Sequence, residues 1–107
     1  MAADGERLIA QLSALANPHR LRVVAALRAR GRDYVSNLAR EVGISRPLLH
    51  LHLGKLQEAG LVTSRLEFST DGKSLNFYEL TDFEIVLTPD VVVEAAKSLP
   101  EQNSGSN

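Results

Sequence analysis

Cysteine is absent from this sequence of 107 residues, which excludes disulfides, thiolate metal sites and cysteine nucleophiles. No apolar stretch is long enough to span a membrane. A signal peptide is not expected either, because Asp4 and Glu6 stand where positive charge would precede an apolar run. We therefore expect a cytoplasmic protein with no membrane partner.

Residue groupings typical of catalysis are missing as well. The sequence contains no Ser-His-Asp arrangement and no glycine-rich phosphate loop. His50 and His52 are two residues apart, which is not the spacing of a zinc site on a helix. Asp90 and Glu94 have no histidine beside them in the last predicted helix. We expect no enzymatic activity, no metal site and no cofactor.

Length and composition fit one small globular domain. Apolar residues make up 44% and charged residues 23% of the chain, as in ordinary soluble domains, and this length is enough for one modest core. We assign residues 1–99 to a single domain. Residues 100–107 have no apolar anchor and are predicted to form a disordered tail.

Charge is distributed unevenly along the chain, although the formal net charge is −1. Residues 17–65 hold nine basic and three acidic residues, whereas residues 66–107 hold two basic and eight acidic ones. A basic segment beside an acidic one suggests a polyanion on one surface and a different partner on another. The alternative is that the arginines only solvate helices.

Three helices are predicted in the first 43 residues. The first covers residues 6–16, with leucines at helical spacing. The second begins at Asn17-Pro18, because asparagine is a good cap and proline suits the first helical position. The third is short, with Ser36 as its cap and Gly43 at its end. Four residues of the second helix are predicted to point inward: Leu21, Val24, Ala25 and Leu27.

A fourth helix follows after a turn of three residues. Ser45 is its predicted cap, and Pro47 falls in its first turn, where a missing N–H does no harm. Two helices joined by a turn of this length match a helix-turn-helix.

The fourth helix, residues 46–58, is apolar on more than one side. On a wheel of about 100° per residue, Leu49, Leu53 and Leu56 form one stripe, which predicts contact with the core. Leu51 lies nearly opposite this stripe, and Leu48 lies well away from it. The side with Leu51 is the one that a recognition helix presents to the DNA major groove.

Strand-forming residues follow the fourth helix. The segments LVTSRLEF and SLNFYELT flank Asp71-Gly72, a strong hairpin signal. Residues 83–88 are predicted to continue extended. The Thr-Pro-Asp sequence at 88–90 then provides a cap, a first-position proline and an acidic first turn, which predicts a final helix that ends near Pro100.

Elements in this order indicate a winged helix-turn-helix, mainly α with a β-hairpin wing, in the order ααααββα. The sequence resembles the ArsR/SmtB family of transcriptional repressors. The agreement lies in SRPLLHLHLGKLQEAGLV (45–62), in LANPHRLRVVAAL (15–27) and in the hairpin that ends in FYEL (77–80). It covers about residues 8–80. Leu51 and Gly54 depart from the pattern, because the family often has a polar or basic residue at the first position and a lysine at the second.

The resemblance implies a homodimer that binds a pseudo-palindromic operator in double-stranded DNA and represses transcription until an effector relieves it. Base contacts are implied for Arg46, His50, Leu51 and His52. Backbone contacts are expected from Arg20, Arg22, Arg28, Arg40, Ser45, Lys55, Arg65 and Lys73. The first and last helices are expected to form the dimer interface through Leu8, Leu12, Leu15, Val92, Ala95, Ala96 and Leu99.

Two alternatives remain open at this point. In the first, Leu48 and Leu51 contact a partner protein, and the winged helix is a protein-interaction module. In the second, a pocket between the last helix and the winged helix binds an unidentified small-molecule effector. DNA binding through phosphates would depend steeply on salt, whereas a contact led by leucines would depend on it weakly.

Overall fold

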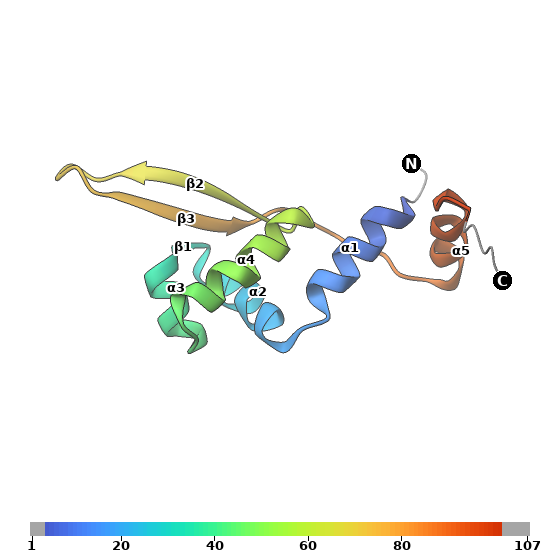
Figure 1. Ribbon diagram of the computed structural model, residues 1–107, viewed down its shortest axis with the longest axis horizontal. Helices are drawn as coiled ribbons and strands as arrows, with labels where there is room; N and C mark the ends of the chain where they lie inside the picture. Colours follow the sequence, from blue (N-terminus) through green and yellow to red (C-terminus); the bar gives the residue numbers. More distant parts are fainter. Residues whose placement is uncertain (1–3, 102–107) are drawn as a thin grey trace.

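The computed structural model of the protein describes residues 4–101 and confirms the winged helix (Figure 1). The elements are α1 (Gly5–Leu15), α2 (Pro18–Arg30), β1 (Arg32–Tyr34), α3 (Val35–Val42), α4 (Arg46–Glu58), β2 (Val62–Phe68), β3 (Ser74–Leu80) and α5 (Pro89–Ser98). No helix in the described range is both long and apolar enough to cross a membrane. Residues 102–107 of the predicted tail lie outside the described residues.

Three helices are capped by the side chains predicted to cap them. The Asn17 carboxamide oxygen accepts hydrogen bonds from the N–H groups two and three residues ahead, at 2.9 and 3.1 Å, and Pro18 takes the first position of α2. The hydroxyl groups of Ser45 and Thr88 accept from N–H groups in the first turns of α4 and α5. These bonds satisfy donors that a helix start leaves without a partner.

α3 differs from its prediction at its start. It begins at Val35 without a side-chain cap. Ser36 lies inside the helix, and its hydroxyl accepts a hydrogen bond from Arg46, so the prediction that Ser36 caps α3 is wrong. Gly43 ends the helix with φ 81°, a left-handed conformation that favours glycine. The chain turns there, and α3 and α4 form the predicted helix-turn-helix.

The core confirms the stripe predicted on α4. Leu49, Leu53 and Leu56 are completely buried. They belong to one cluster with residues from α2, α3 and the region where β2 begins: Val23, Leu27, Leu38, Leu61 and Val62. Burial on this scale holds one face of α4 against the domain and leaves the opposite face outside.

The inward face of α2 was predicted only in part. Leu27 is buried and Val24 is half-buried, but Leu21 is 55% exposed and Ala25 is also exposed. Val23 is completely buried in their place. Apolar residues occupy every position from 23 to 27, so the sequence contains no polar position that would mark the boundary of the buried stripe. α2 contacts α1, α3, α4 and the sheet, and these neighbours decide which side is inward.

β1 is an additional strand that completes a three-stranded antiparallel sheet in the order β1-β3-β2. Arg32 pairs with Glu79, and Tyr34 pairs with Phe77. Asp33, between them, is buried and accepts hydrogen bonds from Arg30 Nε at 2.8 Å and from Asn37. A strand of three residues is too short to show the alternation from which strands are predicted.

β2 and β3 form the predicted wing, with Val62 opposite Leu80 and Phe68 opposite Ser74. Gly72 in the connecting turn has φ 85°, and the Ser69 N–H donates to the Lys73 carbonyl at 2.7 Å. The far half of the hairpin extends beyond the helices (Figure 1).

α5 lies at the other end of the molecule, where it packs against α1 and against no other described helix or strand (Figure 1). Residues 81–88 lead to it without forming a strand, although 83–88 were expected to be extended. Phe83 and Ile85 in this segment pack against the core. The molecule is therefore elongated, 59 Å by 30 Å by 24 Å, with the wing at one end and the α1/α5 pair at the other.

Candidate nucleic-acid interface

The outer face of α4 is the surface on which the predicted base contacts fall. Leu51 is 58% exposed, and Arg46, Pro47, His50 and Lys55 are exposed as well. The buried leucines on the opposite side fix the rotation of the helix, so these side chains point away from the core. The exposed side of α4 therefore carries positive, polar and apolar groups.

Arg46 occupies the first turn of α4. One of its terminal nitrogens, Nη1, donates to the Ser36 hydroxyl on α3 at 2.6 Å. This bond spans the helix-turn-helix and limits the directions in which the guanidinium can point. An arginine has five N–H donors, so donors remain for a second acceptor.

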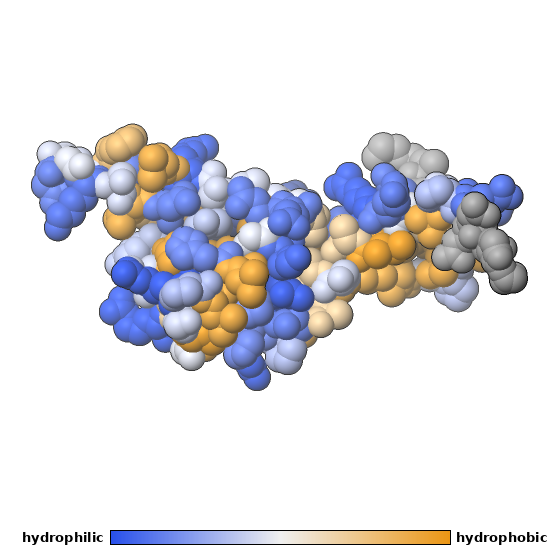
Figure 2. Space-filling view, in the orientation of Figure 1, coloured by the Kyte–Doolittle hydropathy of each residue, from blue (hydrophilic) through white to orange (hydrophobic). Residues whose placement is uncertain are grey.

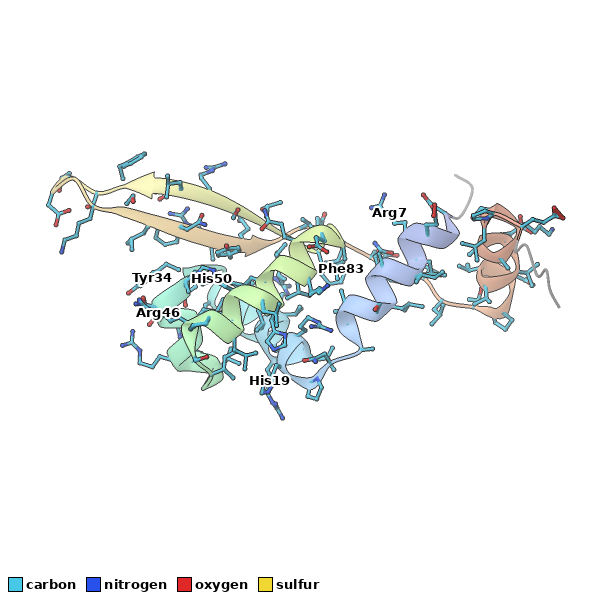
Figure 3. All side chains as sticks on the ribbon, viewed as in Figure 1. Arg7, His19, Tyr34, Arg46, His50 and Phe83 are labelled. Carbon is cyan, nitrogen blue, oxygen red and sulfur yellow. The ribbon has the colours of Figure 1, made fainter. Side chains whose placement is uncertain are left out.

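His50 lies one turn after Arg46 on the same side of α4. Both residues line a cleft of ≈ 580 Å³ that also includes Tyr34 and Asn76. Figure 3 shows Tyr34, Arg46 and His50 together at the end of α4 nearest α3. The predicted positions 46 and 50 are therefore brought together, next to the wing.

His52 is not on this surface, and its predicted base contact is wrong. Its side chain is buried, with the residue 5% exposed, and its Nδ1 lies 3.1 Å from Nη1 of Arg20. Because an arginine can only donate, Nδ1 accepts this bond, and the ring proton of neutral His52 is on Nε2. Nε2 is buried without a partner among the described residues. Burial first, and then the charges of Arg20 and His19, lower the pKa of His52 below the ordinary histidine value.

The Arg20 guanidinium also makes its hydrogen bonds within the domain. Its Nε donates to the Ala14 carbonyl at 2.6 Å while its Nη1 holds His52. The residue therefore connects the end of α1 to α4, and its predicted DNA backbone contact does not fit this placement. Arg20 and His52 are 32 residues apart, and no spacing rule in the sequence links them.

The remaining backbone candidates on the helices divide into two groups. Arg22, Arg40, Ser45 and Lys55 are exposed, and Arg40 is steadied by a bond from Nη2 to Asn37 at 3.2 Å. Arg28 instead lines a pocket formed with the end of β3 and the segment that follows it. No residue of α4 lines that pocket, so Arg28 stands apart from the candidate DNA surface.

The wing carries little free positive charge. Arg32 of β1 forms an ion pair with Glu67 and lies over the Phe77 ring, 4.3 Å from its centroid. Near the tip, Lys73 follows Asp71, and the Ser69 hydroxyl, followed by the Lys73 N–H, lowers the pKa of that carboxyl. Arg65 is exposed on β2.

Apolar groups are also exposed on the wing: Phe68 at 74%, with Leu66 and Leu75.

Comparisons with known proteins agree with this geometry. A model of the helix-turn-helix domain matches residues 15–65. An HTH-type transcriptional regulator of Methanocaldococcus jannaschii is 29% identical over 79 residues, which cover 74% of this chain and 81% of that protein. A possible transcriptional regulator for arsenical resistance is 32% identical, with a TM-score of 0.55, over 81% of this chain and 77% of the other.

A homodimeric winged helix-turn-helix domain from Mycobacterium bovis, a possible ArsR-family regulator, gives a TM-score of 0.62. It is 25% identical and aligns over 86% of this chain and 74% of its own. The chain is ArsR-like, with the fold and the sequence pattern of these winged helix-turn-helix transcriptional regulators. This similarity confirms the resemblance found in the sequence, and the matched proteins are transcriptional regulators rather than enzymes.

The surface of this ArsR-like regulator at α1 and α5 differs in detail from the predicted dimer interface. Leu12, Val92 and Ala96 are exposed, as that role requires, and Leu8 is half-buried. Ala95 is buried within the chain, and Leu15 packs on the core. Leu99 is half-buried beside Gly5.

Other apolar residues at this end were not predicted to belong to the interface. The exposed ones are Ile9, Val86, Leu87 and Val93. Figure 2 shows hydrophobic surface over α1 and α5 in this view. The helical spacing of Ile9 and Val93 could have identified them. Val86 and Leu87 lie within residues 83–88, which were expected only to continue extended, and that expectation did not indicate which side chains would be exposed.

The described residues contain no group of three or more histidine, cysteine, aspartate or glutamate side chains that could hold a metal ion. The two histidines that lie close together are His19 and His52, whose ring centroids are 5.4 Å apart. A third ligand is missing beside them.

Proposed function

We propose that this ArsR-like regulator acts in the cytoplasm as a homodimeric repressor that binds a pseudo-palindromic operator without a metal effector. The observation that carries this proposal is the outer face of α4, which the buried leucines of the opposite face hold in a fixed direction. The wing lies next to its first half, across the cleft that contains Arg46 and His50.

Base recognition is assigned to three residues. Arg46 can donate two hydrogen bonds to a guanine edge, and the Leu51 side chain can contact a thymine methyl group. His50 is exposed one turn beyond Arg46, so it faces a neighbouring base pair. His52 has no part in this, because it is buried.

Contacts with the DNA backbone are assigned to the surroundings of α4. Ser45 accepts the cap bond through its oxygen, so its O–H can donate to a phosphate at the start of the helix. Arg22, Arg40 and Lys55 add positive charge on the helices, and Arg65 and Lys73 add it on the wing. These contacts orient the domain but carry no sequence information.

Dimerisation through the α1/α5 end supports binding to a palindrome. The exposed apolar residues there are positioned to meet the same surface of a second copy. Two recognition helices related by a twofold axis would enter successive major grooves about 34 Å apart. The similar domain from M. bovis is homodimeric, which supports a homodimer here.

The proposal is tested by replacing Arg46 and measuring fluorescence anisotropy on two duplexes. One is an operator selected from random sequence with the purified protein, and the other is an unrelated duplex. We expect Arg46→Ala to weaken operator binding by about 1–3 kcal/mol and to weaken binding to the unrelated duplex much less. Arg40→Ala is the matched control, because loss of a phosphate contact weakens both equally.

An equal loss on both duplexes for Arg46→Ala would leave it with a phosphate contact only. Absence of any salt-sensitive binding by the folded wild-type protein would contradict the DNA-binding proposal itself.

A second candidate function rests on the exposed apolar groups of the same surface. Leu48 and Leu51 on α4, together with Leu66 and Phe68 on the wing, are unusually apolar for a DNA face. Contact with a partner protein would use them directly. Binding of this kind would persist at high salt, whereas DNA binding would not, so a salt titration distinguishes the two functions.

A further inference from the structure

A pocket that no residue of α4 lines is not used by the proposed DNA contacts. It has a volume of ≈ 530 Å³ and lies between α2, the end of β3 and residues 81–83. Small-molecule sites in proteins commonly have volumes of this order. The pocket also adjoins the segment through which the winged body continues to α5.

One wall of the pocket is fixed by hydrogen bonds. The Thr81 N–H donates to the Leu61 carbonyl at 3.0 Å, and the Thr81 hydroxyl donates to the Gly60 carbonyl at 2.8 Å. The segment that begins at Thr81 is therefore held against the turn after α4. Its next two residues, Asp82 and Phe83, line the pocket opposite α2.

Opposite charges share this pocket without forming ion pairs with one another. Arg28 stands on α2, and Glu79 and Asp82 stand on and just after β3. Among residues 4–101 no carboxylate lies within 4.0 Å of the Arg28 guanidinium, and Asp82 makes neither an ion pair nor a side-chain hydrogen bond. Glu79 also faces Arg32, its partner in the sheet. The lining of the pocket therefore contains a guanidinium and a carboxylate that are both available to a ligand.

Apart from Thr81, the rest of the lining has no polar side chain. Leu27 is completely buried, and Val24 and Phe83 are half-buried against the core. A ligand that fits this lining needs a carboxylate for Arg28, an ammonium group for Asp82 and an apolar side group for Val24 and Phe83. Those are the features of an α-amino acid with an apolar side chain.

We propose that this pocket, defined by Arg28, Asp82 and Phe83, binds a free amino acid of the apolar class as an effector. A bound amino acid would link α2 to the segment that leads to α5. Since α5 packs on α1 alone, the ligand would change how the α1/α5 end sits relative to α4. In a dimer, the position of the α1/α5 end determines the separation of the two recognition helices. This regulatory step rests on the proposed function.

The binding step is tested on the full-length protein without DNA. L-leucine and L-phenylalanine are titrated into ¹⁵N-labelled protein and followed by NMR, with calorimetry for the affinity. We expect shifts in the amide signals of Arg28, Asp82 and Phe83. Matched probes that lack one charge are 4-methylpentanoate, without the ammonium group, and 3-methylbutylamine, without the carboxylate, and both should bind about tenfold more weakly or worse.

Variants assign the two charged contacts. Arg28→Gln and Asp82→Asn should each weaken binding by about tenfold or more. Arg22→Gln is the control, because Arg22 is an exposed arginine of the same helix that does not line the pocket. If neither amino acid shifts the pocket signals at about 10 mM, or if Arg28→Gln binds as well as Arg22→Gln, the proposal is overturned.

The consequence for DNA is measured separately. Operator anisotropy is repeated with saturating amino acid, and a change in affinity is expected that Asp82→Asn abolishes. Amino-acid binding without a change in operator affinity would overturn the regulatory step alone. Failure of the wild-type protein to bind DNA would overturn the proposed function and leave the NMR result intact.

Discussion

At the scale of single residues, the contact that most changes the interpretation of the sequence is the one between Arg20 and His52. Both residues were expected on DNA, and both are occupied in joining the end of α1 to α4. The neutral imidazole accepts the arginine bond, whereas a protonated ring would bring two cations together. His52 therefore has to remain neutral for this contact to persist.

The lowered pKa of His52 makes the stability of the fold dependent on pH. The unfolded chain takes up a proton near the ordinary histidine pKa of 6.5, and the folded protein resists it. The contribution is complete above pH 6.5 and is lost as pH falls toward and through the lower folded pKa. In urea unfolding between about pH 7.5 and pH 5.5, we expect His52→Asn to flatten the pH dependence.

Asparagine suits this test because its carboxamide oxygen can accept the Arg20 bond without titrating. His50→Asn, at an exposed position on the same helix, serves as the control and should leave the slope as in the wild type. A wild-type slope in His52→Asn would contradict the assignment.

At the scale of elements, two helical glycines have opposite surroundings. A β carbon on Gly5, at the start of α1, would lie 2.3 Å from the Ala95 carbonyl oxygen of α5, whereas one on Gly54, in α4, would meet nothing within 4 Å. Gly54→Ala should therefore raise the free energy of unfolding by about 1 kcal/mol through helix propensity alone. Gly5→Ala should lower it by about 1–3 kcal/mol, because two backbones have to separate.

Chemical denaturation of the two variants measures this difference directly. Equal stabilisation by both would mean that α1 and α5 do not approach closely. The Gly5 N–H also donates to the Ser98 hydroxyl at 2.7 Å, so loss of close contact would remove that bond too.

Sequence patterns predicted the elements whose signals are local. The caps at Asn17, Ser45 and Thr88 and the turn at Gly72 depend on neighbouring residues only, and the structure has them where predicted. β1 and the inward side of α2 depend on partners far along the chain, and these were missed or misassigned. The same holds for the candidate site. The exposed face of α4 was predicted from the helical spacing of its leucines, whereas the burial of His52 depends on Arg20 and was not predicted.

At the scale of the whole molecule, the wing and the α1/α5 pair lie at opposite ends of the long axis. α5 has ten residues, and its contact with the described elements is limited to α1. A helix of this length is marginal in water unless it is docked. The apolar side chains left exposed there indicate that α1 alone does not complete the docking surface, and a second copy would complete it.

A charge placed on that surface should disrupt the dimer. Val93 is 50% exposed on α5, so Val93→Asp would place a charge in the proposed dimer interface without disturbing the core. We expect sedimentation equilibrium to give a dimer for the wild-type chain and a monomer for the variant. Operator affinity should fall with it, because each half-site then has to be bound separately.

Leu21→Asp provides the matched control. Leu21 is similarly exposed, at 55%, but lies on α2, which does not contact α5. It should leave the protein dimeric. If Val93→Asp stayed dimeric while remaining folded, the partner surface would have to be sought at the other end of the molecule, where Leu66 and Phe68 of β2 are 55% and 74% exposed.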